Sequence, residues 1–333
     1  MVPGGEVVLP FSLASDSDIP QAPVNVRTRP SISDGTVKTD TGQIIRSFEG
    51  MRVYETAPKA ADPAVWALGR ELGFNTARVA VKTVSIGRTV AQQLDLIDQV
   101  VEAARNNRCY VMLMYADDAP GAYQDNIPAN RDKAIAFWSE AAPRYKDEPH
   151  VFYEMINEPD RKGAVAIYIG SAPNNTPTAL LTSIRAIFNV MRSGAPDTII
   201  AVPSDINIES ATGAARYVAV IQAFEALGSS VDWTKTAWSY HHYNQTHILG
   251  VNDNLATDGG AAGLAYIKAR YPLLMTEWNY WIEDARIVLQ YDMRIYEQLQ
   301  IGYAILSNPT SVPSYLAPVL DDLRSVGYNI PVE

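Results

Sequence analysis

The chain has 333 residues, of which 47% are hydrophobic, so it is long enough for two ordinary domains or for one large α/β barrel with a sizeable core. It carries 27 basic and 37 acidic residues, and the resulting net charge of -10 argues against nucleic acids and anionic membranes as main partners. No apolar run approaches the roughly 20 residues of a membrane span, and the single cysteine, Cys109, excludes an intrachain disulfide.

The first thirty residues show neither helical nor strand periodicity. Five prolines are scattered among them, and we interpret residues 1–30 as an extended arm or linker. No basic segment followed by an apolar core is visible, so no signal peptide is recognised in this stretch. We expect a secreted or periplasmic protein whose leader lies outside this sequence, and a cytoplasmic location stays open.

A short hairpin is predicted next. Residues 36–39 and 43–46 are strand-like and flank Asp40-Thr41-Gly42, where the glycine can adopt a positive φ. This N-terminal hairpin is expected to close the floor of the domain that follows.

From Ser47 onward, strand-like and helix-like segments alternate eight times. Strands are expected at residues 48–54, 75–81, 109–115, 151–157, 198–203, 236–242, 273–277 and 300–307, and helices at 62–72, 89–106, 131–145, 178–193, 214–227, 259–270, 284–298 and 314–325. This alternation, with no internal linker, predicts an α/β fold with a single (β/α)8 TIM barrel over residues 31–333. The alternative is a doubly wound open sheet, but the segment Glu55-Thr56-Ala57-Pro58 after the first strand lacks the glycine-rich phosphate turn.

Two of the predicted strands end in a carboxylate. A mostly apolar run over residues 151–156 stops at Asn157-Glu158-Pro159, and the proline ends the strand and presents Glu158 at its carboxyl end. A similar run over residues 272–276 leads into Glu277. Either acid alone is equally well explained as a solvated side chain. As a pair on the fourth and seventh strands, they can face each other across the barrel mouth, as hydrolysis of a glycosidic bond requires.

At these residues the chain resembles the clan A glycoside hydrolases, and it is most similar to family 5, the group of cellulases and mannanases. The resemblance runs from about Ser31 to the C-terminus. Asn157-Glu158-Pro159 matches the strand-four motif, which implies that Glu158 is the acid/base and that Asn157 binds the 2-hydroxyl of the sugar. Thr276-Glu277-Trp278 matches the strand-seven segment, which implies that Glu277 is the nucleophile and that the reaction retains the anomeric configuration.

Three more residues fall at positions that the family uses. Arg78 matches the strand-two arginine beside the nucleophile, where a guanidinium would keep Glu277 ionised and oriented. On the sixth strand, the resemblance implies that His241 contacts substrate and tunes the acid/base, and that the Tyr243 hydroxyl holds Glu277.

The loop after Glu277 carries two tryptophans. Trp278 and Trp281 can stack on a sugar ring, although packing under a loop is an equal alternative. No metal and no cofactor are expected. The chain has only four histidines, and the adjacent His241 and His242 point to opposite faces of a strand.

Two positions depart from the family pattern. Ala116 stands near the place of a histidine after the third strand, and the eighth strand lacks the tryptophan that often lines the cleft. Both departures concern recognition of the substrate. We predict a retaining glycoside hydrolase that cleaves a β-glucan-type polysaccharide or oligosaccharide by endo or exo action. The alternatives are a catalytically silent barrel that binds carbohydrate and a metal-assisted hydrolase that chelators would inhibit.

Overall fold

The computed structural model describes residues 27–52, 62–83, 87–116, 130–157, 178–202, 211–243, 260–279, 286–305, 316–325 and 327. Within these ranges, eight parallel strands form a barrel that closes because β10 pairs with both β9 and β3 and β8 pairs with β9. The strands are β3 (Arg46–Arg52), β4 (Thr76–Val81), β5 (Tyr110–Tyr115), β6 (Val151–Glu154), β7 (Ile200–Val202), β8 (Thr236–Tyr243), β9 (Leu273–Asn279) and β10 (Gly302–Ile305). The predicted TIM barrel is confirmed, and the open sheet is excluded.

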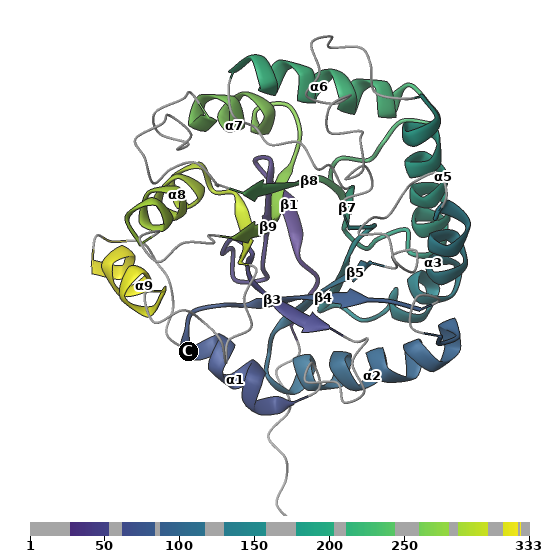
Figure 1. The fold of residues 1–333 in the computed structure, drawn as a ribbon, viewed down its shortest axis with the longest axis horizontal. Helices are drawn as coiled ribbons and strands as arrows, with labels where there is room; N and C mark the ends of the chain where they lie inside the picture. The colour runs from purple at the N-terminus through teal and green to yellow at the C-terminus, as the bar shows by residue number, and fades with distance from the viewer. Residues whose placement is uncertain are drawn as a thin grey trace, which may run out of the picture.

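Helices surround this barrel as a ring (Figure 1). They are α1 (Pro63–Glu71), α2 (Val90–Asn106), α3 (Arg131–Tyr145), α5 (Thr178–Gly194), α6 (Ala211–Glu225), α7 (Gly260–Lys268), α8 (Arg286–Leu299) and α9 (Leu316–Ser325). Two of them begin at clear capping signals: Asp62 accepts a hydrogen bond from the Ala64 amide, and Thr89 forms a capping box with Gln92. Among the helices that the structure describes, none has both the length and the apolar character of a membrane crossing.

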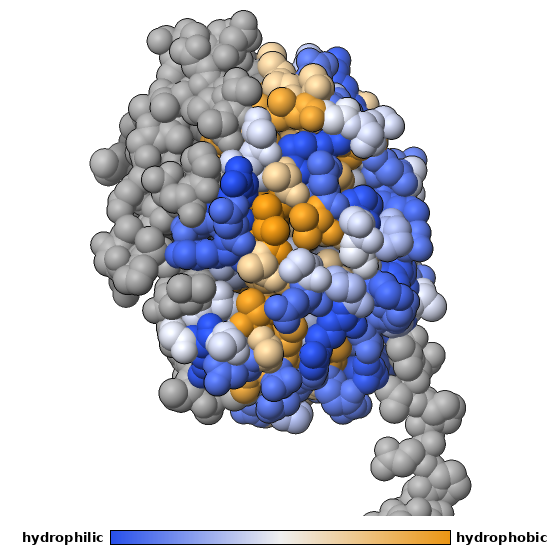
Figure 2. Space-filling view, turned by 90° about the vertical axis from the view of Figure 1, so that its right-hand side faces the viewer, coloured by the Kyte–Doolittle hydropathy of each residue, from blue (hydrophilic) through white to orange (hydrophobic). Residues whose placement is uncertain are grey.

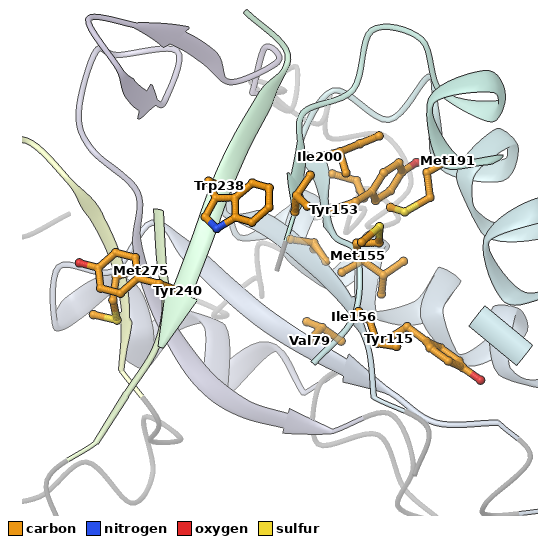
Figure 3. Close-up of a cluster of buried hydrophobic side chains, with 14 of the residues drawn as sticks. Val79, Tyr115, Tyr153, Met155, Ile156, Met191, Ile200, Trp238, Tyr240 and Met275 are labelled. Carbon is orange, nitrogen blue, oxygen red and sulfur yellow. The ribbon is translucent and has the colours of Figure 1, made fainter. Parts of the chain in front are cut away.

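Successive side chains of each strand point alternately into the barrel and toward the helices, so the core has an inner and an outer shell. Inward-facing side chains such as Met112 and Phe152 cluster inside the barrel. Outward-facing side chains such as Tyr153 and Trp238 pack under the helices, where Met191 of α5 joins them (Figure 3). On the face over α3 and α5, hydrophilic side chains flank a narrower band of hydrophobic ones (Figure 2). Because both faces of the sheet are buried, a polar side chain on the inner face needs a partner.

An N-terminal hairpin lies at the end of the barrel where the strands begin, but it is formed by earlier residues than predicted. It consists of β1 (Ser31–Ser33) and β2 (Thr36–Lys38), joined by Asp34 and Gly35, both with positive φ, as the strand twist of a two-residue hairpin favours. The turn predicted at residues 40–42 is present but supports only one antiparallel bridge, between Lys38 and Ile44. β2 pairs with the start of β9, and Val37 joins the inner shell, so the hairpin fills the floor as expected.

The last residues of the predicted arm are attached to the base of the barrel. Arg27 donates to Asp40 and to the Arg108 carbonyl, and Arg29 donates to Thr198 and to the Lys146 carbonyl. Residues 1–26 lie outside the described residues, so the rest of the arm stays a prediction.

Two glycines of the hairpin region allow a matched test of the floor. Gly35→Ala is expected to destabilise the protein more than Gly42→Ala. Both glycines have a positive φ, which costs an L-residue about 1–2 kcal/mol. A Cβ on Gly35 would also lie 2.6 Å from the Lys268 carbonyl oxygen, whereas one on Gly42 would meet nothing within 4 Å. Urea unfolding of both variants measures the difference, and equal losses would show that the hairpin is not fixed against α7.

Candidate active site

The site is built around Arg78, whose side chain is completely buried. It lies on β4 between Thr76 and Ala80, and the two-residue period directs it into the barrel. Its Nη1 donates to Glu277 Oε2 at 2.6 Å, and its Nη2 donates to Asn157 Oδ1 at 2.9 Å. The guanidinium therefore connects the segment that follows β6 with β9 across the interior.

A second carboxylate, Glu154, binds the same guanidinium and was not among the predicted site residues. Glu154 is the last residue of β6 and is fully buried. It accepts from Arg78 Nε at 2.5 Å and from Arg78 Nη2 at 2.9 Å, so the pair is bidentate. The signal in the sequence is a single acid in an otherwise apolar run. Glu154 follows Phe152 by two positions, so both side chains lie on the same face of the strand.

A bulge in β9 turns Glu277 toward this cluster. The pairing of β8 with β9 shifts between Tyr240 and His241, which leaves one extra residue, Thr276, in β9. Leu274 and Glu277 both face the interior although they are three positions apart. A regular strand would place residues at that spacing on opposite faces, so the bulge is what aims the carboxylate at Arg78.

His241 completes the described cluster. It lies directly opposite Glu277 in the sheet, and it is 3% exposed. Its Nε2 is 3.4 Å from Arg78 Nη2 and 3.7 Å from Glu154 Oε1, and its Nδ1 is 3.9 Å from Glu277 Oε2. The imidazole thus borders all three charged side chains.

The charges in this cluster compensate each other. Burial by itself raises the pKa of Glu154, but the Arg78 guanidinium and the neighbouring His241 outweigh it and hold the pKa of that carboxyl below its ordinary value. Glu154 is therefore ionised near neutral pH. Arg78 carries one positive charge and contacts two carboxylates. Its charge is balanced by that of Glu154, so the charge of Glu277 is left over.

The structure thus brings together four of the predicted residues: Arg78, Asn157, His241 and Glu277. The other four cannot be placed as side chains: Glu158 and Trp281 lie outside the described residues, as do the side chains of Tyr243 and Trp278, whose backbones belong to β8 and β9. Their roles stay predictions.

Ala116 marks the departure from the family pattern. It is buried just after β5 and clusters with Ala80 and Met114. Ala80 follows Arg78 by two residues on β4, and Met114 of β5 pairs with Glu154 in the sheet. The part of the barrel wall formed by Ala80, Met114 and Ala116 is apolar.

The closed barrel, with a charged cluster where its strands end, places the protein in the class of (β/α)8 barrels that carry a site at the carboxyl-terminal mouth. Comparison with known proteins then gives the family. The profile of the cellulase family, glycosyl hydrolase family 5, matches residues 39–306. This chain belongs to that family.

Curated relatives are similar over part of their length. The chain is 25% identical to Endoglucanase A of Butyrivibrio fibrisolvens over 231 residues, which are 66% of this chain and 46% of the relative. It is 25% identical to Endoglucanase Z of Dickeya dadantii (strain 3937) over 183 residues, 55% of this chain and 34% of the relative. The chain therefore spans less than half the length of these two relatives.

Solved structures support the fold. Cellulase Cel5C_n matches with a TM-score of 0.64 at 16% identity, over 94% of this chain and 91% of that chain. An endocellulase of Pyrococcus horikoshii, solved in complex with cellotetraose, matches with a TM-score of 0.62 at 15% identity, over 91% of this chain and 100% of that chain.

Proposed function

We propose that this chain is a retaining glycoside hydrolase that cleaves β-glycosidic bonds in a β-glucan-type polysaccharide. The observation that carries the proposal is the buried Arg78, which holds the Glu277 carboxylate at 2.6 Å on the inner face of the barrel. Membership of the cellulase family and similarity to two endoglucanases favour a β-glucan as substrate.

In the proposed mechanism Glu277 attacks the anomeric carbon. A bond forms between its carboxylate oxygen and C1, the bond from C1 to the leaving oxygen breaks, and Glu158 protonates that oxygen. Water then attacks C1 and gives its proton to Glu158, and the Glu277 carboxylate leaves. Retention follows from two displacements on C1.

Asn157 has a fixed orientation that suits the proposed contact with sugar. Its Oδ1 accepts from Arg78, which is only a donor, so the amide nitrogen must point the other way. That NH₂ group is then directed to donate to a sugar hydroxyl. Such a bond would strengthen in the transition state and add to the rate.

A trapping experiment tests the reaction. Incubation with an activated 2-deoxy-2-fluoro-β-glycoside of glucose or cellobiose is expected to inactivate the enzyme, with loss of the activated leaving group, and to add the mass of one fluoroglycosyl group to the peptide that contains Glu277. A parallel screen of β-glucans, mannans, xylans and aryl glycosides, with products sized by chain length, identifies the glycan and endo or exo action. Glycan binding with neither label nor turnover would contradict hydrolysis, and an inverted product would contradict retention.

A further inference from the structure

We propose that Glu154 is a positioning residue that neutralises Arg78, so that Arg78 can orient Glu277 without cancelling its negative charge. The inference rests on the proposed function, in which Glu277 is the nucleophile. It assigns a task to a buried carboxylate that the two-glutamate mechanism does not use.

The first argument is geometric. Glu154 binds the edge of the guanidinium formed by Nε and Nη2, and this bidentate contact fixes the plane of the group. With that edge occupied, Nη1 is directed at Glu277 and the second N–H of Nη2 at Asn157. The position of the nucleophile therefore depends on a residue that does not touch it.

The second argument is the balance of charge. Arg78 and Glu277 alone would form a neutral pair, and the cation would weaken the carboxylate as a nucleophile. With Glu154, the three side chains carry one net negative charge, which resides on Glu277, the more exposed of the two acids at 8% against 0%. The direction of the Glu154 pKa, below its ordinary value, agrees with this state.

The third argument concerns the covalent intermediate. When Glu277 forms an ester with C1, it loses its charge, and a guanidinium that depended on it would become an unpaired buried cation. Glu154 remains as the counter-ion of Arg78 throughout this step. The hydrogen bonds from Arg78 to Glu154 and Asn157 therefore persist in both halves of the cycle.

Two titratable side chains of the described residues lie against Glu154. They are Arg78 from β4 and His241 from β8, and Arg78 in turn binds Glu277 on β9. Met114 of β5 pairs with Glu154 in the sheet and is apolar. A change of charge at position 154 should therefore be felt at these three side chains.

Glu154→Gln is expected to lower kcat about 10–100-fold with little change in KM, since the nucleophile is misplaced and its charge is quenched. The acidic limb of the kcat/KM profile is expected to move to lower pH, because the buried cluster loses one negative charge while the Arg78 cation remains. Glu154→Asp keeps the charge and is expected to keep the wild-type limb while kcat falls.

The matched control is Glu297→Gln. Glu297 of α8 forms a second buried bidentate pair, with Arg46 of β3, at 2.8 Å and 2.9 Å. Its loss should destabilise the fold in the same way, yet leave the pH profile unchanged. An unmoved acidic limb in Glu154→Gln, or a moved one in Glu154→Asp, overturns the proposal. A wild-type enzyme without turnover or label would instead refute the proposed function, so the two failures are distinguishable.

Discussion

Glu277→Gln is expected to lower kcat on a β-glucan by roughly 10⁴–10⁶-fold and to leave the barrel folded. The amide oxygen can still accept from Arg78, but a neutral amide does not attack the anomeric carbon. The guanidinium keeps Glu154 as its counter-ion, so no buried charge is left unpaired. Steady-state turnover and thermal unfolding of the same preparation measure the two halves of this expectation.

Chemical rescue provides the control for Glu277. Glu277→Ala leaves space for azide, which should attack C1 from the face that the glutamate used and displace an aryl leaving group, giving an α-glycosyl azide. In Glu158→Ala, azide should instead attack the glycosyl-enzyme and give the β product. A β product from Glu277→Ala, or retained turnover in Glu277→Gln, would refute the assignment of the nucleophile.

Most of the barrel could be predicted because its strands are buried on both faces. All six residues of β5 are buried, and such a strand forms a continuous apolar run that ends at polar residues. The end of β6 was predicted three residues late. Met155 and Ile156 are as apolar as the strand before them, but both pack into the outer shell. Successive residues of a regular strand cannot do so, and β6 ends at Glu154.

The candidate site could be predicted only in part. Arg78, Asn157, His241 and Glu277 stand in segments that resemble the family motifs, and the structure brings them together. Glu154 could not be assigned from the same pattern, since its partner is 76 positions away and its inward direction depends on the phase of two strands. A completely buried guanidinium requires a counter-ion, and the sequence pattern pairs Arg78 with Glu277 alone.

The inward direction of the Glu277 side chain could not be predicted from the sequence either. From Leu274, a regular strand would turn Glu277 toward the helices. The bulge at Thr276 reverses this direction, and a one-residue shift in pairing leaves no mark in composition or periodicity.

Arg78→Met is expected to cost about 3–5 kcal/mol of unfolding free energy and to reduce kcat below that of Glu154→Gln. The substitution leaves two carboxylates, 0% and 8% exposed, on the same face of the interior without a cation. The substitution also removes the hydrogen bonds by which the guanidinium orients Glu277 and the Asn157 amide. Urea unfolding and initial rates on the folded variant measure both losses.

The stability loss should depend on pH with a definite sign. In the wild type the pKa of Glu154 is lowered, so its contribution is present above the pKa of the unfolded chain and is lost as pH falls through the folded pKa. In Arg78→Met, burial dominates and raises the pKa of this carboxyl, so the variant is penalised above the unfolded pKa and relieved below it. The difference between wild type and variant should therefore shrink between about pH 7 and about pH 4.

Arg46→Met is the control that separates the loss of a buried ion pair from the loss of catalysis. It breaks the other buried pair, Arg46 with Glu297, which lies between β3 and α8 and outside the site cluster. Its unfolding free energy should fall by a similar amount while the folded variant keeps a wild-type kcat.

Arg78→Lys tests the geometry of the contacts, since an ammonium keeps the charge but cannot reproduce the forked contacts of the guanidinium. Its kcat is expected to fall about 10²-fold with a smaller loss of stability. A stability gap for Arg78→Met that does not shrink as the pH falls would mean that Glu154 is not ionised in the wild type, and the charge balance argued for this site would then be wrong.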